Sequence, residues 1–240
     1  SPADLWPPRC SPMLRFMNLR LLASLGLVPI SALAISAHMT PLSALQLGGR
    51  PAEEWAIVLE SGRRLGSLEI DEVVSRMGIQ PGDVIADVGA GTGVFAVSLA
   101  RATGPTGTVL AVEVDPGFLP MIAQKAVDGA VENVQTVLGE FTDPKLPRRD
   151  VDVAFFHDVI HHIEGRQAYL QATARYMAPG SRVVVVDYHG DRPGAPHSGQ
   201  PELLITLRQV QEWMSVAGYD MTQELDLFED KFFVVFTKRD

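Results

Sequence analysis

The sequence predicts a doubly wound α/β fold, with a mostly parallel seven-stranded sheet and an antiparallel strand at its C-terminal end. From residue 53 onward, short runs rich in Val, Ile and Ala alternate with amphipathic segments. Nearly unbroken apolar runs are typical of parallel strands that helices cover on both faces. The last two strands, 221–227 and 231–238, have too few residues between them for a parallel crossover, so they must be antiparallel.

The expected elements follow one another in a regular order. Two helices, 53–65 and 69–77, come first, and Gly78 stands at a C-cap position of the second. Five strands precede the final pair; they are expected over 84–89, 108–114, 134–139, 151–157 and 182–188. The helices between strands are expected over 93–102, 116–127, 165–177 and 202–217, with Ala178-Pro179-Gly180 as the stop signal of the third.

Composition and charge exclude several classes of protein. The chain has 240 residues, of which 46% are hydrophobic and 20% charged, which is typical of a globular domain. Its net charge of −9 lacks the basic footprint that a nucleic-acid partner requires. The single cysteine, Cys10, excludes an intramolecular disulfide and a cysteine-cluster metal site. The charge therefore argues against a nucleic-acid partner, and the sequence does not indicate an oligomeric state.

Residues 1–50 are expected to form a leader separate from a folded domain over 51–240. An apolar run over 21–37 follows Arg15 and Arg20, and small residues close it. The pattern suits a secretory signal peptide or an organelle transit peptide, and it is marginal as a membrane anchor. A disordered stretch without a targeting role is the remaining alternative.

The segment Asp87-Val88-Gly89-Ala90-Gly91-Thr92-Gly93 is the most informative motif in the chain. It leaves a strand and opens a helix, where free backbone N–H groups can face a ligand. Its glycines allow a cofactor to approach the backbone without meeting a Cβ. Glu113 ends the next strand, and a carboxylate there can accept both hydroxyl protons of a ribose. A plain tight turn is the alternative for the glycines.

Two cofactors fit this motif. The dinucleotide pattern G-x-G-x-x-G requires a glycine at position 94, where the chain has Val94. The pattern D-x-G-x-G-x-G instead resembles the class I, Rossmann-like S-adenosylmethionine-dependent methyltransferases. The resemblance covers about residues 53–240 and is greatest to small-molecule methyltransferases related to quinone-biosynthesis enzymes. Further landmarks in the family's order are Pro81-Gly82-Asp83, Gly139-Glu140-Phe141, Asp152, Met177-Ala178-Pro179-Gly180 and Ala217-Gly218-Tyr219.

The resemblance implies S-adenosylmethionine as the cofactor and methyl transfer to a small, lipophilic acceptor. It implies that Glu113 binds the ribose, and that Glu140 with Phe141 binds the adenine, although a solvated acid is the alternative for Glu140. A cofactor-binding or scaffold protein without turnover is the alternative function, and an NAD-dependent reductase is a third. The cofactor would be available in the cytoplasm or an organelle interior, with or without membrane association, while the signal-like leader leaves export open. The methionine end of the cofactor is assigned to Asp87, Gly89, Ala90, Gly91 and Gly93.

The acceptor is expected at the end of the fourth strand, where the candidate catalytic residues are His157, Asp158 and His161. In one interpretation the two histidines share a helical face and one of them is a general base. A zinc ion held by these three residues is an alternative, although our prediction includes no metal. In a third interpretation the histidines only line the pocket or cap the helix, and proximity alone drives catalysis.

Two other regions are candidates for walls of the pocket. The N-terminal helices, residues 53–78, are expected to cover the cofactor as a lid through Trp55, Arg63 and Arg64. Packing of an ordinary amphipathic helix on the sheet is the alternative. The segment 188–190 and the long loop 191–200 that follows it could form the wall on the acceptor side.

Overall fold

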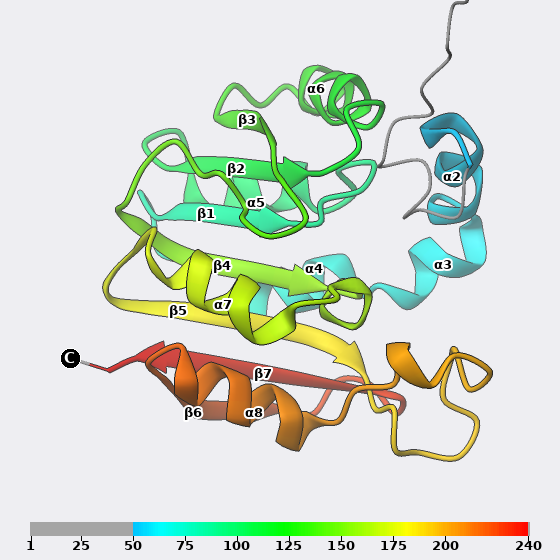
Figure 1. The fold of residues 1–240 in the computed structure, drawn as a ribbon. Helices are drawn as coiled ribbons and strands as arrows, with labels where there is room; N and C mark the ends of the chain where they lie inside the picture. The colour runs from blue at the N-terminus through cyan, green and yellow to red at the C-terminus, as the bar shows by residue number, and fades with distance from the viewer. Residues whose placement is uncertain (1–49, 240) are drawn as a thin grey trace, which may run out of the picture. The chain divides into compact units, whose positions relative to one another are not determined.

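The computed structural model describes residues 50–239, so the predicted leader lies outside the described residues. Seven strands form a single sheet in the order β3-β2-β1-β4-β5-β7-β6 (Figure 1). Only β7 runs antiparallel to its neighbours, β5 and β6. The predicted fold class is confirmed. The strands are β1 (Val84–Val88), β2 (Thr108–Glu113), β3 (Val134–Leu138), β4 (Val151–His157), β5 (Met177–Tyr188), β6 (Tyr219–Leu225) and β7 (Lys231–Lys238).

The strand order reverses between β1 and β4, which lie side by side in parallel. In open parallel sheets of this kind, ligands bind beyond the carboxyl ends of the strands at such a switch point. The glycine segment follows β1, Glu113 ends β2 and His157 ends β4. The topology therefore brings the predicted cofactor and acceptor residues to the same edge of the sheet.

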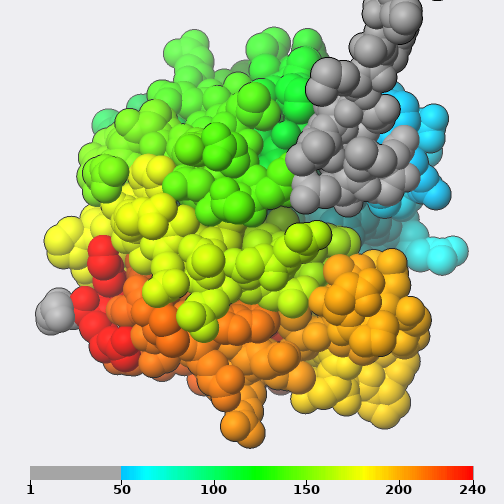
Figure 2. Space-filling model, in the orientation of Figure 1, coloured from blue at the N-terminus to red at the C-terminus, as the bar shows by residue number. Residues whose placement is uncertain are grey.

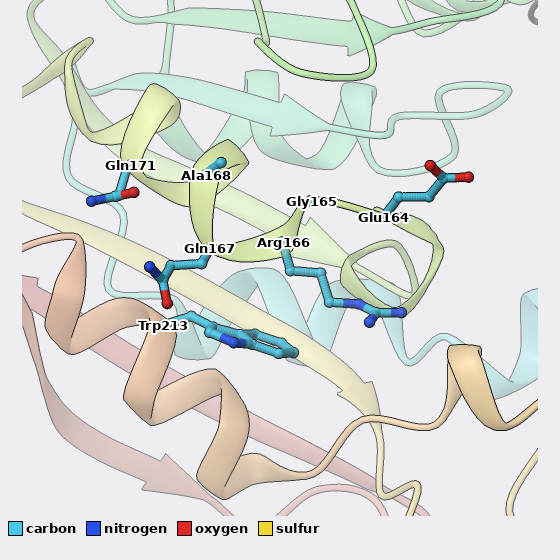
Figure 3. Close-up of a pocket in the computed structure, with 7 residues that line it drawn as sticks. All are labelled: Glu164, Gly165, Arg166, Gln167, Ala168, Gln171 and Trp213. Carbon is cyan, nitrogen blue, oxygen red and sulfur yellow. The ribbon is translucent and has the colours of Figure 1, made fainter.

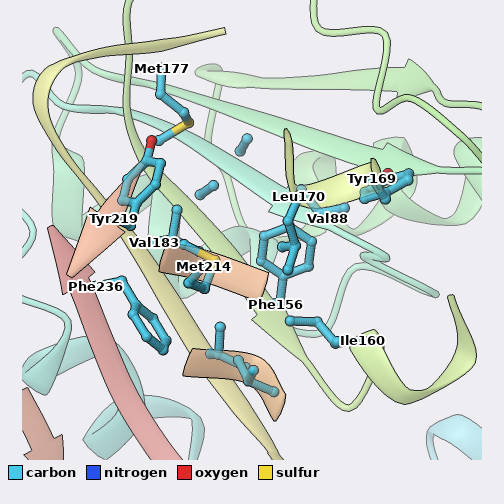
Figure 4. Packing of buried hydrophobic residues seen from close by; sticks show 14 of the residues in the cluster. Val88, Phe156, Ile160, Tyr169, Leu170, Met177, Val183, Met214, Tyr219 and Phe236 are labelled. Carbon is cyan, nitrogen blue, oxygen red and sulfur yellow. The ribbon is translucent and has the colours of Figure 1, made fainter. Parts of the chain in front are cut away.

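Helices cover both faces of the sheet. Helices α7 (Arg166–Ala174) and α8 (Leu207–Val216) bury Leu170 and Met214 on one face, together with Phe156 of β4 (Figure 4). On the other face, α4 (Ile70–Arg76) and α5 (Ala96–Thr103) pack on a second cluster of buried apolar residues. All five residues of β1 are buried, as expected for a central strand covered on both faces. The remaining helices are α2 (Ala52–Leu59), α3 (Gly62–Ser67), α6 (Leu119–Asp128), η1 (Ile160–His162) and η2 (Pro201–Leu203).

The first predicted helix, 53–65, is wrong as a single element, because α2 and α3 are separate helices. Ser61 interrupts them with an extended backbone, at φ −59° and ψ 140°. The Ser61 side chain makes no capping hydrogen bond, but Ser61 and the following Gly62 are both weaker helix formers than alanine or leucine, so the chain breaks here at low cost.

The helix predicted over 165–177 ends at Ala174, and the following strand starts at Met177 instead of residue 182. Pairing between strands overrides the stop signal, since Met177 pairs with Val151 and the register then shifts. Gly180 accommodates the irregular backbone with a φ of +66°. Pro179 and Gly180 therefore lie within β5, where we expected a turn.

Three other helices begin later than predicted, at Ala96, Leu119 and Leu207. The start of α8 has a clear cause, because the Thr206 side chain accepts a hydrogen bond from the backbone of Gln209 and forms a capping box with it. Among the described residues, no helix is long and apolar enough to cross a membrane.

Candidate functional site

The glycine segment joins the carboxyl ends of β1 and β2. The backbone N–H groups of Gly89 and Ala90 both donate to the carbonyl oxygen of Val112, at 3.0 Å each. The N–H of Gly91 donates to Oε2 of Glu113 at 2.9 Å. The predicted ribose-binding carboxylate therefore also holds the glycine turn in place.

Two of these glycines are required by their surroundings. Gly89 has a φ of +75°, and a Cβ there would lie 2.3 Å from Cγ2 of Val159. Gly93 has a φ of +80°, and its Cβ would lie 3.1 Å from the backbone of Ile122. Val159 follows β4, so the close approach at Gly89 connects the cofactor side of the site to the segment that carries the histidines.

Asp87 and Glu113 form a buried acidic pair below the glycine segment. Burial, and secondarily the nearby Glu113, raise the pKa of Asp87 to about 7. Burial also raises the pKa of Glu113, although hydrogen bonds from three backbone N–H groups act in the opposite direction. Oδ2 of Asp87 has no hydrogen-bond partner among the described residues. A buried acceptor atom without a partner is costly, and it fits a donor group supplied by a bound molecule.

At the end of β4, His157 is buried against aromatic rings. Its ring lies 4.8 Å from that of Phe95 and 6.4 Å from that of Phe228, measured between centroids. Burial lowers the pKa of His157 to about 3, so the imidazole is neutral at physiological pH. Its Nδ1 lies 3.5 Å from Oδ2 of Asp158, and its Nε2, like that of His161, is buried without a partner among the described residues.

Asp158, the next residue, anchors an ion-pair network. Lys231 donates to its Oδ2 at 3.0 Å, and Arg64 of α3 at 3.3 Å. Burial acts to raise the pKa of Asp158, but His157, Lys231 and Arg64 together hold it below its ordinary value. The non-glycine backbone adopts a φ of +54°. Asp158 therefore turns the chain sharply from β4 into η1.

His161 lies in η1, and its ring is fixed by Asp187 at the carboxyl end of β5. Nδ1 of His161 lies 2.6 Å from Oδ1 of Asp187, and the backbone N–H of His161 donates to Oδ2 at 3.2 Å. Asp187 is fully buried and also accepts a hydrogen bond from the N–H of Tyr188. With Nδ1 protonated toward the carboxylate, Nε2 of His161 keeps its lone pair. This buried atom has no partner among the described residues.

Comparison with known proteins agrees with this geometry. Residues 86–185 match the family model described as a methyltransferase domain. A solved S-adenosylmethionine-dependent methyltransferase from Aquifex aeolicus superposes with a TM-score of 0.70 at 20% identity, over 78% of this chain and 98% of that one. Residues 86–185 are thus similar to a methyltransferase domain, and the chain has the fold of a solved S-adenosylmethionine-dependent methyltransferase.

Two relatives of known name are only distantly similar in sequence. The ubiquinone/menaquinone biosynthesis C-methyltransferase of Ectopseudomonas mendocina is 27% identical over 120 residues, which are 50% of this chain and 46% of the relative. The arsenite methyltransferase of Halobacterium salinarum is 28% identical over 107 residues, which are 45% of this chain and 27% of the relative. The chain thus spans less than half the length of either relative.

The predicted adenine residues are less clearly placed than the glycine segment. Glu140 is exposed, and its Oε2 lies 3.2 Å from Nζ of Lys145. Phe141 is 36% exposed. The segment that carries Glu140 and Phe141 is joined to the cofactor edge by its backbone, because the N–H of Gly139 donates to the carbonyl oxygen of Glu113. The adenine assignment therefore stays a prediction.

The N-terminal helices α2 and α3 lie at the same edge of the sheet as the glycine segment (Figure 1). A Cβ on Gly91 would lie 3.5 Å from Cδ1 of Leu59 in α2, and Glu60 pairs with Lys125 of α6 at 2.8 Å. Arg64 joins Asp158, as described above, whereas Arg63 is exposed. The lid stays a prediction; of its three predicted residues, Arg64 contacts the site through Asp158, and Leu59 is a further residue of these helices that lies near the glycine segment.

The predicted shared helical face of His157 and His161 is wrong. His157 ends a strand, whereas His161 lies in a short 3-10 helix after the turn at Asp158. The structure groups His161 with His162 and His197, whose ligand nitrogens all lie within 4.8 Å of one another. The sequence did not single out Asp187, although its position at the end of a central strand is a usable signal.

A hollow of about 370 Å³ lies between α7 and α8, away from the glycine segment (Figure 3). Arg166 borders it and lies over the ring of Trp213. The same guanidinium donates to the carbonyl oxygen of His161 at 2.7 Å. Arg166 therefore ties the start of α7 to η1, and the residues that line the hollow include neither the acidic pair nor the three histidines.

Proposed function

We propose that this chain transfers the methyl group of S-adenosylmethionine to a small acceptor at the carboxyl edge of β1, β2, β4 and β5. The observation that carries the proposal is the pairing of two half-sites at one edge. The glycine segment with Asp87 and Glu113 forms the cofactor side, and His161 held by Asp187 forms the acceptor side. The contact between Gly89 and Val159 fixes the spacing of the two sides.

On the cofactor side, each group has a defined task. The N–H groups and the open backbone of the glycine segment allow close approach, and Glu113 accepts hydrogen bonds from the ribose hydroxyls. Asp87 offers its unpartnered Oδ2 to a donor at the methionine end. When bound, S-adenosylmethionine supplies a sulfonium methyl group for in-line displacement by the acceptor.

On the acceptor side, His161 is the residue placed to activate the acceptor. Its Nε2 has a lone pair, a fixed direction and no competing partner among the described residues. His157 is held among phenylalanine rings with a strongly lowered pKa, so we assign it to packing. We assign Asp158 to positioning η1 through Lys231 and Arg64.

The acceptor class is suggested only coarsely by the relatives. One is named for C-methylation in quinone biosynthesis and the other for arsenite, and these acceptors share little chemistry. A small molecule is common to both. We propose that the chain acts in a compartment that supplies S-adenosylmethionine. If the acceptor is lipophilic, we propose that the chain associates with a membrane through its apolar N-terminal run. Fractionation of cells that produce the tagged chain tests both proposals.

Calorimetry and a methyl-transfer assay test the proposal. The purified chain should bind S-adenosylhomocysteine and show no comparable binding of NADH. Labelled methyl groups from S-adenosylmethionine should be transferred to one member of a panel that includes a demethylated quinol and arsenite. His161→Ala should lower turnover by about 10²–10⁴-fold with nearly unchanged cofactor affinity. Cofactor binding without transfer to any member of a broad metabolite panel would instead favour the non-catalytic alternative.

A further inference from the structure

Three histidines from two separate segments meet at the acceptor edge. His161 and His162 lie in η1, and His197 lies in the loop that follows β5. The ring centroids are 4.0 Å apart for His161 and His162, 5.1 Å for His161 and His197, and 5.6 Å for His162 and His197. One nitrogen from each ring falls in a group whose members all lie within 4.8 Å.

The innermost ring of this cluster is oriented as a ligand would need to be. His161 is only 3% exposed, and its Nδ1 is held by the fully buried Asp187. Histidines that bind metals commonly donate their other ring N–H to a carboxylate, which fixes the tautomer and strengthens the ligand. The remaining nitrogen, Nε2, is buried without a partner among the described residues.

The third ring is brought in by a closed loop. The N–H of Gly190 donates to the carbonyl oxygen of Ile205 at 2.7 Å, which joins the two ends of the loop. Within it, Nδ1 of His197 lies 3.2 Å from Oε1 of Gln200, and its backbone has a φ of +64°. As Figure 2 shows, the segment that contains this loop forms surface at the same end of the molecule as α2 and α3.

We propose that His161, His162 and His197 bind one divalent transition metal ion of the zinc type. Three imidazole nitrogens with a fourth position left open are a ligand set that zinc uses in catalytic sites. Tetrahedral bonds of about 2.0–2.1 Å place such nitrogens about 3.3 Å apart. Small side-chain rotations of the exposed His162 and the loop residue His197 would close the cluster to that spacing around the fixed His161.

Metal binding at this cluster does not depend on methyl transfer, so the two proposals can fail separately. If both hold, the open position points to an acceptor with a hydroxyl or thiol group, which the bound cation stabilises as its anion while the proton is released to solvent water. His161 would then activate the acceptor through the metal. A neutral carbon acceptor without such a group would not use the site.

Equilibrium titration with metal ions tests the site in the full chain. After treatment with a chelator and its removal, the protein should take up one Zn²⁺ in competition with a chromophoric chelator, and one Co²⁺ with visible bands characteristic of nitrogen ligands. Mg²⁺ should not compete, because this cluster offers no oxygen ligands. His162→Ala and His197→Ala should each weaken Zn²⁺ binding by at least about 10-fold, and Asp187→Asn by about 10–100-fold.

Two control variants locate the effect. His189→Ala removes a histidine near the cluster whose ring instead lies against Phe232, and His38→Ala removes one outside the described residues. Both should bind Zn²⁺ like the natural chain. His162 and His197 are at least partly exposed, so their variants should fold normally, as circular dichroism would verify. Absence of stoichiometric Zn²⁺ binding, or unchanged binding in both of these variants, would overturn the proposal.

Discussion

Replacing Asp87 by Asn should make the unfolding free energy of the ligand-free protein less dependent on pH. Asp87 is 3% exposed, and its pKa is raised from 3.8 to about 7. A carboxyl group with a higher pKa in the folded state holds its proton longer there than in the unfolded chain. Raising the pH from about 4 to about 7 therefore lowers the free energy of unfolding, and above pH 7 this loss is complete.

The magnitude follows from the size of the shift. A difference of about 3 pH units, at about 1.36 kcal/mol each, gives a loss of about 4 kcal/mol across the whole window. Between pH 5 and pH 8 the free energy of unfolding should fall by about 3 kcal/mol. An unfolded aspartate has already ionised at pH 5, so only about the last 2 pH units below the folded-state pKa fall in this range. Asn has a similar shape and no charge, so the variant should keep most of that free energy.

Urea unfolding at pH 5 and pH 8 measures the effect as a difference between the variant and the natural protein. The difference matters, because His157 contributes a pH dependence of the opposite sign. Asp128→Asn is a matched control, since its side chain is exposed on α6. That control should follow the natural protein. Parallel pH profiles for Asp87→Asn and the natural protein would refute the assignment of a buried, protonated carboxyl to Asp87.

The same variant tests the cofactor assignment. If Asp87 receives a charged donor at the methionine end, it must be ionised to bind it well. The affinity of the natural protein for S-adenosylhomocysteine should then rise with pH up to about 7 and level off. Asp87→Asn should bind more weakly, with little change over that range. A variant that is both more stable at high pH and weaker in binding would show that the buried acid is kept for its ligand.

Three other substitutions probe the site. Gly89→Ala should destabilise the protein by about 1–3 kcal/mol more than Gly180→Ala in thermal unfolding, because both positions have positive φ but only Gly89 would clash with Val159; equal losses would contradict this. The natural protein should lose up to about 5 kcal/mol of unfolding free energy as the pH falls from 6.5 toward 3, because the buried imidazole of His157 stays neutral while an unfolded histidine becomes charged. His157→Phe should remove this loss, as urea unfolding at pH 7 and pH 4 would show. An unchanged loss in the variant would exclude the assignment. Glu113→Ala should weaken S-adenosylhomocysteine binding by about 10–150-fold for each hydrogen bond lost, as measured by calorimetry; unaltered affinity would remove the ribose assignment.

The sequence predicted the sheet well because its central strands, such as β1 and β4, are buried and apolar on both faces, a pattern that few other structures produce. The helix boundaries were less predictable, since they depend on contacts between distant residues. Met177 enters β5 because Val151 pairs with it, in spite of a local stop signal at Pro179. Ser61 and Gly62 are the contrary case, in which two locally weak helix formers ended a helix that the apolar pattern would have continued.

The cofactor side and the acceptor side of the site also differ in how far the sequence could predict them. The cofactor side was predictable because a single turn presents it, with Glu113 one strand away in a fixed register. The acceptor side joins η1, the end of β5 and the following loop, so no local spacing relates His161 to Asp187 or His197. The predicted pair of His157 and His161 relied on a continuous helix, which the turn at Asp158 prevents.

The backbone shows why that turn does not carry a glycine. On the cofactor side, Gly89, Gly91 and Gly93 take up the left-handed conformations without cost. On the acceptor side the positive φ angles fall on Asp158 and His197, where a left-handed residue with a side chain costs about 1–2 kcal/mol. A glycine would relieve that strain at either position, but it would remove the ion pairs of Asp158 with Lys231 and Arg64, or an imidazole from the cluster. The cofactor side needs open backbone and therefore uses glycines. The acceptor side needs side chains and therefore uses polar residues in a strained backbone conformation.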